Sequence, residues 1–303
     1  MGCYPQQVMI RTLLFATLAI CLPVSAGAEE APRPKSIWAA GNPGWVKPVD
    51  PFRIAGNVHF VGTEGLGIFL ITGEDGHILI DGGLPGFEDQ VLDSIRSLGF
   101  DPADVKVLLN THAHFDHSGG LAYIKDVTGA EFWAMSEDVS QLEGGFYVGA
   151  EDNAAFNAPP VKVDRVLTDG EEIHLGDITL TARLTPGHSP GCTSWWTSIE
   201  EGGEALDLLI FCSATVAANR LAPPQYEGIV EDYRKTFRVT KDWQPDIFVA
   251  NHPGFSNLMA ERLKAEAGEP DAYRNTELFT RMMSRLEEEF EKALKNQTAE
   301  AGQ

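Results

Sequence analysis

The chain has 303 residues, of which 43% are hydrophobic, so it is long enough to bury the core of one large domain or two small ones. The formal net charge at pH 7 is −21. This charge argues against nucleic-acid binding, which needs a basic surface, and is typical of a well-solvated exterior.

The first 28 residues have the pattern of a secretory signal peptide. Arg11 precedes the apolar run 12–24, and Ala26-Gly27-Ala28 follows as a small-residue cleavage pattern. A transmembrane anchor is the weaker interpretation, because the apolar run is too short to span a bilayer comfortably. We therefore expect a mature chain, 29–303, that is periplasmic or secreted and carries no membrane segment.

The cysteines divide between this leader and the mature chain. Cys3 and Cys21 fall in the leader, which leaves Cys192 and Cys212. An even pair in an oxidising compartment is consistent with a disulfide between them. A lipoprotein signal at Cys21 is the alternative to simple cleavage, but Ile20 stands where such signals carry a small residue.

The mature chain opens with a segment that has no clear period. Residues 29–50 are rich in proline, glycine and tryptophan, and we expect an extended arm laid across the body of the protein. Trp38 and Trp45 in this arm need other groups to pack against. A strand over 54–61 follows, and then a hairpin of strands 67–72 and 77–81.

The remaining elements follow from hydrophobic periodicity. The patterns predict helices over 87–98, 119–127, 229–239 and about 274–295, and strands over 105–109, 131–135, 171–174, 178–184, 193–198, 205–211 and 247–250. Each half of the chain thus has a strand meander followed by alternating helices and strands, within one domain. The irregular segment 144–160 is long enough to be functional, and its aromatic residues favour a lid or substrate wall over simple packing.

One stretch directly after the strand 105–109 is crowded with metal-ligand side chains. His112, His114, Asp116 and His117 fall within six residues. Open α/β sheets place their sites at the carboxyl ends of strands. An extended backbone would point the alternating His112, His114 and Asp116 the same way. Because such groups are costly to bury without partners, the stretch predicts a transition-metal site.

Other strand ends carry further candidates. His188 lies in a loop of prolines and glycines, which indicates a rigid turn that aims the imidazole, and His252 follows the strand 247–250. Asp81 ends the strand 78–80 and is either a helix cap or a group that orients a ligand histidine, and we favour the second role. We expect His59, His77 and His174 to lie outside the site.

Six ligands are too many for one tetrahedral zinc, which in a catalytic site takes three protein ligands and a water. They divide into one site of His112, His114 and His188 and a second site of Asp116, His117 and His252. Imidazole and carboxylate without thiolate suit zinc best, and iron and manganese are the alternatives. Two zinc ions per subunit, about 3.5–4 Å apart, would share a water and lower its pKa to near neutrality, which predicts metal-assisted hydrolysis.

These motifs resemble the metallo-β-lactamase superfamily. His112-Ala-His114-Phe-Asp116-His117 is similar to its HxHxDH signature, and Asp81-Gly82-Gly83 and the loops of His188 and His252 fit as well. The resemblance covers nearly all of the mature chain. It is closest to the third subclass of class B β-lactamases, which carries His at the position of His117. It implies an α/β (α+β) fold, the four-layer αββα sandwich, with the zinc pair at one edge between two sheets.

The resemblance also implies substrate-binding residues. Ser213 falls where other subclasses ligate zinc with Cys and non-lactamase relatives bridge the metals with Asp. Ser213 and Thr215 would hold the substrate carboxylate, with Thr215 in place of the usual serine. In some members a disulfide joins the positions of Cys192 and Cys212, which would make Cys212 structural. The alternative assignment is that Cys212 is a zinc ligand. Ala217-Ala218-Asn219 replaces the small and aromatic residues that are usual in this segment.

The sequence therefore predicts a dizinc hydrolase that opens the β-lactam ring of penicillins, cephalosporins and carbapenems through a metal-bridging hydroxide, and so gives antibiotic resistance. Asp116 would orient the hydroxide and relay its proton, while Trp38 and the segment 144–160 would wall the cleft. The alternative is a dizinc relative that acts on another lactone, ester or thioester. A non-catalytic metal module is disfavoured, because each site keeps an open position. We expect a monomer with a small-molecule substrate.

Overall fold

The computed structural model describes residues 1–2 and 33–302, so nearly all of the predicted leader lies outside the described residues. Contacts divide the chain into the units Met1–Pro32 and Arg33–Gln303, and the second unit contains every described helix and strand. Among the described residues, no helix combines the length and the apolar character needed to cross a membrane.

Two β-sheets form the centre of this second unit. The first has seven strands in chain order: β1 (Phe52–Ala55), β2 (Val58–Phe60), β3 (Phe69–Gly73), β4 (Gly76–Ile80), β5 (Val105–Leu109), β6 (Glu131–Met135) and β7 (Arg165–Leu167). The second has five strands, in spatial order β12 (Ile247–Ala250), β11 (Glu204–Phe211), β10 (Thr193–Glu201), β9 (Ile178–Leu184) and β8 (Glu172–Leu175).

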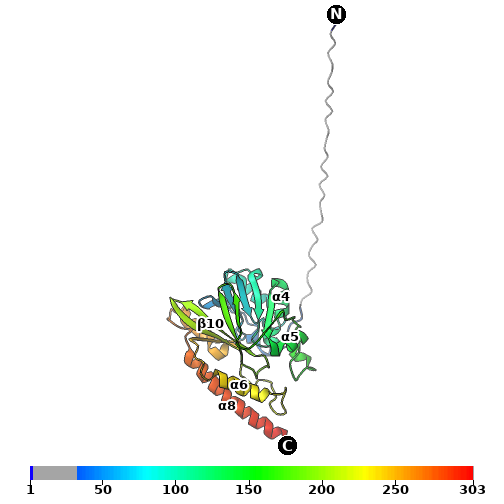
Figure 1. The fold of residues 1–303 in the computed structure, drawn as a ribbon, viewed down its shortest axis with the longest axis vertical. Helices are drawn as coiled ribbons and strands as arrows, with labels where there is room; N and C mark the ends of the chain where they lie inside the picture. The colour runs from blue at the N-terminus through cyan, green and yellow to red at the C-terminus, as the bar shows by residue number, and fades with distance from the viewer. Residues whose placement is uncertain (3–32, 303) are drawn as a thin grey trace. The chain divides into compact units, whose positions relative to one another are not determined.

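Helices cover the outer face of each sheet. The α-helices are α1 (Trp38–Gly41), α2 (Glu88–Ser97), α3 (Phe115–Ser118), α4 (Leu121–Thr128), α5 (Val139–Gly144), α6 (Ile229–Thr240), α7 (Leu258–Glu266) and α8 (Thr276–Ala301). Short 3₁₀ turns are η1 (Pro43–Trp45), η2 (Pro102–Asp104), η3 (Ser136–Asp138), η4 (Ala154–Phe156) and η5 (Pro253–Ser256). In Figure 1, α6 and α8 lie side by side on one flank, and α4 and α5 lie on the other.

The period-2 alternation of the strands explains this layering. Ile78 and Ile80 of β4 join a core shared by both sheets, whereas Leu79 packs with Val91 and Ile95 of α2. Successive side chains of a strand point to opposite faces, so a strand covered on both sides is apolar throughout. On the far side, five α8 residues are buried in a third cluster with α6: Phe279, Met282, Met283, Leu286 and Phe290. The predicted αββα sandwich is confirmed.

Strand direction determines which loops meet. Strand β4 runs parallel to β5, and β11 runs parallel to β12. Because parallel strands end at the same edge, Asp81 lies beside the segment after Leu109, and the residues after Phe211 lie beside those after Ala250. The two edges also meet each other, since the Thr193 amide donates to the Thr111 carbonyl (2.7 Å) and the Gly67 amide donates to the Asn251 carbonyl (2.7 Å).

Several predicted boundaries were wrong. The strand over 54–61 is instead the hairpin of β1 and β2, because Gly56 adopts a left-handed φ of 51° that turns the chain. The described part of the arm is not extended throughout, since it contains α1 and η1. The sequence patterns did not predict strand β7 and helix α7.

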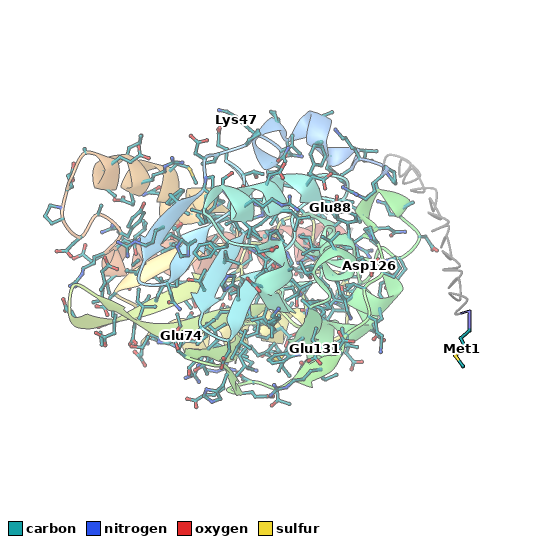
Figure 2. The ribbon with its side chains drawn as sticks, turned by 90° about the horizontal axis from the view of Figure 1, so that it is seen from above. Met1, Lys47, Glu74, Glu88, Asp126 and Glu131 are labelled. Carbon is teal, nitrogen blue, oxygen red and sulfur yellow. A yellow bond between two sulfur atoms is a disulfide. The ribbon has the colours of Figure 1, made fainter. Side chains whose placement is uncertain are left out.

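Charged side chains such as Lys47, Glu74, Asp126 and Glu131 are exposed, as expected for a strongly charged chain (Figure 2).

Candidate metal centre

All six predicted ligand residues meet at the shared edge of the two sheets. The ligand atoms of His112, His114 and His188 lie within 4.8 Å of one another, and so do those of His112, Asp116 and His117. His252 completes the second group, because its Nε2 is 3.2 Å from Nε2 of His117 and 3.5 Å from Oδ2 of Asp116. The first sheet supplies four of these side chains, and the second sheet supplies His188 and His252.

The backbone reaches this arrangement in a way that the sequence pattern did not predict. His114 is extended, with φ −71° and ψ 149°, but α3 begins at Phe115, so Asp116 does not continue the expected alternation. The helical turn of α3 instead brings the side chains of the consecutive residues Asp116 and His117 close to His112. Gly120 permits this packing, because a Cβ there would lie 2.2 Å from the Gly82 carbonyl oxygen.

Asp81 is fully buried and anchors the second group. Its carboxylate accepts hydrogen bonds from the Thr111 amide (2.6 Å) and the Thr111 hydroxyl (2.8 Å), and its Oδ2 is 3.0 Å from Nδ1 of His117. These are contacts of a group that orients a histidine rather than of a helix cap. Asp81 has a left-handed φ of 70°, a conformation that aspartate tolerates better than most residues.

Two other imidazoles are held by backbone carbonyls. Nδ1 of His188 donates to the Thr215 carbonyl (2.8 Å), and Nδ1 of His252 donates to the Gly65 carbonyl (2.9 Å). Donation from Nδ1 leaves Nε2 of each ring unprotonated and free to bind a cation.

The imidazoles of the two groups differ in charge: burial favours the neutral form in the three-histidine group, whereas His117 of the second group favours the protonated form. Burial lowers the pKa of His112 and His114 well below the usual value, and it lowers that of His188 to about 4. Burial also opposes the charged form of His117, but the carboxylates of Asp116 and Asp81 outweigh it and raise the pKa of His117 to about 10. Although burial opposes its ionised form, the histidines around Asp116 hold its pKa below the usual range. In the metal-free second group His117 is therefore a cation beside the ionised Asp116, and a bound metal ion would take the place of its proton.

A metal ion fits these residues. Nε2 of His112 and Nε2 of His114 are buried and have no hydrogen-bond partner among the described residues, which is costly unless a ligand satisfies them. The donor set consists of imidazoles and one carboxylate, which suits zinc best. Three protein ligands per group leave an open position at each, as in catalytic rather than structural zinc sites.

Asp138 is an anchoring residue that the sequence interpretation missed. It is fully buried at the end of η3, and its carboxylate accepts from the amides of Ala113 (2.9 Å) and Gly191 (2.7 Å) and from the Ser189 hydroxyl (2.9 Å). Burial raises its pKa to about 6, against the lowering effect of these donors. Asp138 therefore ties the loop of His112 and His114 to the loop of His188. Asp138 lies three residues after the end of β6, and a polar residue just after a strand is also the pattern that identified the ligands.

The aromatic arm residue Trp38 contacts the irregular segment 144–160. Its ring stacks with Phe115 (centroids 5.5 Å) and Phe156 (5.4 Å), and its Nε1 donates to the Ala155 carbonyl (2.6 Å). Trp45 lies 5.7 Å from the His252 ring. The arm and the segment 144–160 therefore meet beside α3, which carries two of the ligands.

The predicted substrate-binding hydroxyls lie next to the three-histidine group. Oγ of Ser213 is 3.1 Å from Oγ1 of Thr215, which is itself 3.3 Å from Nδ1 of His188. A disulfide joins Cys192 and Cys212, with Cα atoms 5.9 Å apart. Cys212 is thereby removed from the possible ligands, which excludes the alternative assignment.

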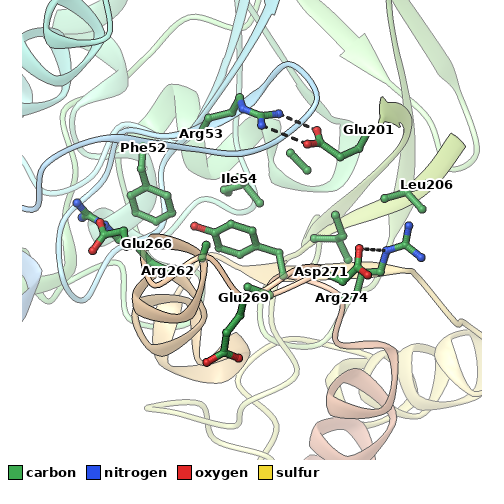
Figure 3. Close-up of a pocket in the computed structure, with 15 residues that line it drawn as sticks. Phe52, Arg53, Ile54, Glu201, Leu206, Arg262, Glu266, Glu269, Asp271 and Arg274 are labelled. Atoms are coloured by element: carbon green, nitrogen blue, oxygen red, sulfur yellow. Dashed lines mark hydrogen bonds and ion pairs between the residues drawn. The ribbon is translucent and has the colours of Figure 1, made fainter. Parts of the chain in front are cut away.

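A cleft elsewhere on the surface does not resemble a second site. This cavity of about 400 Å³ lies between β1 and the chain around Tyr273, and none of the six ligands lines it (Figure 3). Its cations are already paired, since Arg53 contacts Glu201 (2.7 Å) and Arg274 contacts Asp271 (3.2 Å). The remaining predicted non-ligands lie outside the metal centre too: His59 and His77 pack against Phe100, and His174 is exposed.

The chain is similar in sequence to known metal-dependent hydrolases. A family model described as the metallo-β-lactamase superfamily matches residues 68–201. A probable metallo-hydrolase of Burkholderia pseudomallei is 32% identical over 129 residues, which are 42% of this chain and 42% of that protein. The N-acyl homoserine lactonase AttM of Agrobacterium fabrum is 31% identical over 157 residues, 42% of this chain and 57% of that protein. The matches span about half the length of these curated relatives.

Solved structures match over much more of the chain. BJP-1, a subclass B3 metallo-β-lactamase of Bradyrhizobium japonicum, is 44% identical with a TM-score of 0.83, and the match covers 84% of this chain and 97% of BJP-1. The native FEZ-1 metallo-β-lactamase from Legionella gormanii is 35% identical with a TM-score of 0.80, covering 83% of this chain and 97% of FEZ-1.

Proposed function

The chain belongs to the metallo-β-lactamase superfamily, and on that premise we propose that it is a dizinc hydrolase that opens the β-lactam ring of penicillins, cephalosporins and carbapenems. The observation that carries the proposal is the likeness to a subclass B3 β-lactamase over 97% of that enzyme's length. The lactonase match covers only 42% of this chain.

The six ligand residues of the centre would form two zinc sites. His112, His114 and His188 would hold one zinc ion, and Asp116, His117 and His252 would hold the other. Bound zinc polarises a carbonyl and lowers the pKa of water to near neutrality.

The chain's own groups would then bind the substrate and move the proton. The carboxylate of Asp116, which is ionised at neutral pH, would orient the attacking water and accept its proton. The hydroxyls of Ser213 and Thr215 would donate hydrogen bonds to the substrate carboxylate. Trp38, stacked on Phe115, would wall the cleft and exclude bulk water.

The proposal extends to the whole chain. A cleaved leader over 1–28 would deliver a monomeric domain, 29–303, to the periplasm or the exterior, where a disulfide is stable. In that compartment β-lactam hydrolysis would give antibiotic resistance.

A second candidate is the hydrolysis of another lactone, ester or thioester. It is favoured by the sequence match to AttM, an N-acyl homoserine lactonase. Against it stands Ser213, because non-lactamase relatives are expected to carry a metal-bridging Asp there.

The test is an assay of the purified zinc-loaded chain with a penicillin, a cephalosporin, a carbapenem and an N-acyl homoserine lactone, each with and without a chelator. We expect chelator-sensitive opening of β-lactams and weak or absent lactone opening. If the zinc-loaded protein turns over no β-lactam, the proposal is wrong, and lactone turnover alone would establish the second candidate.

A further inference from the structure

Asn219 is a buried residue in the loop after β11 whose side chain has every polar atom occupied. It is 3% exposed. Its Oδ1 accepts from the Tyr147 hydroxyl (2.6 Å) and from Nε2 of Gln225 (3.0 Å), and its Nδ2 donates to the His188 carbonyl (2.9 Å) and the Tyr233 hydroxyl (3.0 Å). The donors on one side and the carbonyl on the other determine the orientation of the amide.

Two of these contacts lead to the imidazoles of the three-histidine group. The ring of Tyr147 stacks on the ring of His114, with centroids 4.2 Å apart and an interplanar angle of 14°. The Tyr233 hydroxyl donates to the Thr215 carbonyl (2.7 Å), which is the same oxygen that accepts from Nδ1 of His188. Asn219 therefore connects the supports of His114 and His188, and none of its hydrogen bonds reaches Asp116, His117 or His252.

The end of helix α8 holds Asn219 from the other side. Nε2 of Gln297 donates to the Asn219 carbonyl (3.2 Å), and its Oε1 accepts from the amides of Leu221 (2.6 Å) and Ala222 (3.4 Å). The loop 219–222 has backbone groups that would otherwise lack these partners. The helix is in turn packed on the core, where Phe290 stacks with Tyr233 (centroids 5.0 Å).

We propose that Asn219 is a positioning residue for the metal site of His112, His114 and His188, and that Gln297 of α8 holds Asn219 in place. The proposal rests on the proposed function only in that the centre binds metal. It gives α8, whose last turns contain no ligand, a defined effect on one of the two metal sites. Groups that orient ligands commonly change metal affinity about 10- to 100-fold when they are replaced.

The main variant is Asn219→Asp, which keeps the shape but turns an acceptor toward the His188 carbonyl. Zinc affinity is measured by competition with a chromophoric chelator in two backgrounds of the full mature chain. In His252→Ala the remaining complete site is the three-histidine site, and we expect Asn219→Asp to weaken zinc about 10- to 100-fold. In His188→Ala the remaining complete site is that of Asp116, His117 and His252, and we expect less than a twofold change.

Milder variants keep the test decisive if Asn219→Asp does not fold. Tyr147→Phe removes one hydroxyl and leaves the ring stacked on His114, and Gln297→Ala removes the contact with α8. Tyr147→Phe loses one hydrogen bond and Gln297→Ala loses three, but only one of those three reaches Asn219, so each variant should weaken the three-histidine site several-fold. The matched control is Asn296→Ala, an exposed neighbour of Gln297 on α8, which should leave zinc affinity unchanged.

The outcomes separate this inference from the proposed function. If the unmutated chain binds no zinc, the proposed function fails and the inference fails with it. If the chain binds two zinc ions and the Asn219, Tyr147 and Gln297 variants change neither site, or weaken both sites equally, the inference alone is overturned. Circular dichroism of each metal-free variant identifies those that are folded, and only folded variants enter the comparison.

Discussion

Asp138 is a single buried carboxylate that holds two metal-ligand loops, and it has no cationic partner in the part of the chain that the structure describes. Each oxygen accepts two hydrogen bonds: Oδ1 from Gly191 and Gln141, and Oδ2 from Ala113 and Ser189. Asn in its place would turn an NH₂ group toward two donors. We expect Asp138→Asn to lower the free energy of unfolding of the metal-free protein by about 2–4 kcal/mol in urea titrations at pH 7.

Glu137 provides the matched control for that prediction. It is exposed and adjacent in sequence, so Glu137→Gln should change the free energy of unfolding by less than about 0.5 kcal/mol. Equal stability of the Asp138→Asn and Glu137→Gln proteins would contradict the anchoring role of Asp138.

Asp81 allows the charge that orients His117 to be tested without a backbone change. Asparagine tolerates the left-handed φ of 70° about as well as aspartate does, so Asp81→Asn alters mainly the charge and one acceptor. One oxygen that serves both the Thr111 hydroxyl and His117 is then lost or replaced by a donor. We expect zinc at the site of Asp116, His117 and His252 to bind about 10- to 100-fold more weakly.

The measurement is zinc content after dialysis against a chelator of graded strength. Asp81→Asn should lose one equivalent of zinc at a lower chelator strength than the unmutated protein, and the other equivalent should be unaffected. Simultaneous release of both equivalents would show that Asp81 supports the whole centre rather than His117.

At the residue scale, the sequence was informative where a side chain follows a strand. Four ligands lie close together in sequence, and His188 and His252 follow strands β9 and β12, so all six could be assigned to one edge. Asp138 also follows a strand end, but neither its anchoring role nor that of Asn219 could be derived from position alone. Their roles depend on hydrogen bonds to residues distant in sequence, such as Ala113, 25 positions from Asp138, and Gln297, 78 positions from Asn219, which no local pattern encodes.

At the scale of elements, the strands of the sheet core were predicted with nearly their observed bounds, because strands covered on both faces form continuous apolar runs. The failures occurred where a local backbone feature intervened. Gly56 breaks an apolar run into β1 and β2, and α3 is a single turn too short to show a helical period. Helix α7 was missed because only Leu258 among its residues is buried, which leaves little apolar pattern to detect.

The contact between the arm and the segment 144–160 predicts the local stability of that segment. Trp38 supplies one aromatic stack and one hydrogen bond to the segment, through Phe156 and Ala155, together worth about 1–3 kcal/mol. We expect Trp38→Ala to speed amide hydrogen exchange over 150–158 by roughly 5- to 150-fold, because the wall opens more often. The exchange rate of Trp38→Phe should lie between those of Trp38→Ala and the unmutated protein, because Phe keeps the stacking but not the hydrogen bond.

Ile37 provides the control for the arm. Its side chain is 71% exposed, so Ile37→Ala should leave exchange over 150–158 unchanged. If Trp38→Ala leaves that exchange unchanged as well, the arm does not stabilise the segment, and its proposed part in walling the cleft loses its support.

At the scale of the whole molecule, the metal centre lies where the two sheets meet, and its ligands come from both. The family resemblance predicted this arrangement, whereas strand patterns alone could not, because they do not say which edges of two sheets face each other. The interlocking hydrogen bonds between Thr193 and Thr111 and between Gly67 and Asn251 hold the two edges together independently of metal. The centre is therefore built where backbone hydrogen bonds already join the two sheets.

The disulfide reinforces this edge without contributing a metal ligand, so its removal should lower the stability of the fold and leave metal binding intact. Cys192 precedes β10 and Cys212 follows β11, and the bond closes a loop with a sequence separation of 20. A loop of that length restricts the unfolded chain by about 3 kcal/mol in the chain-entropy model. We expect the double variant Cys192→Ala/Cys212→Ala to lower the free energy of unfolding by about 2–4 kcal/mol in urea titrations, and to retain two zinc ions at neutral pH, because neither sulfur is a ligand. Loss of one zinc equivalent would mean that Cys212 serves the metal after all, and unchanged stability would mean that the bond does not constrain the edge.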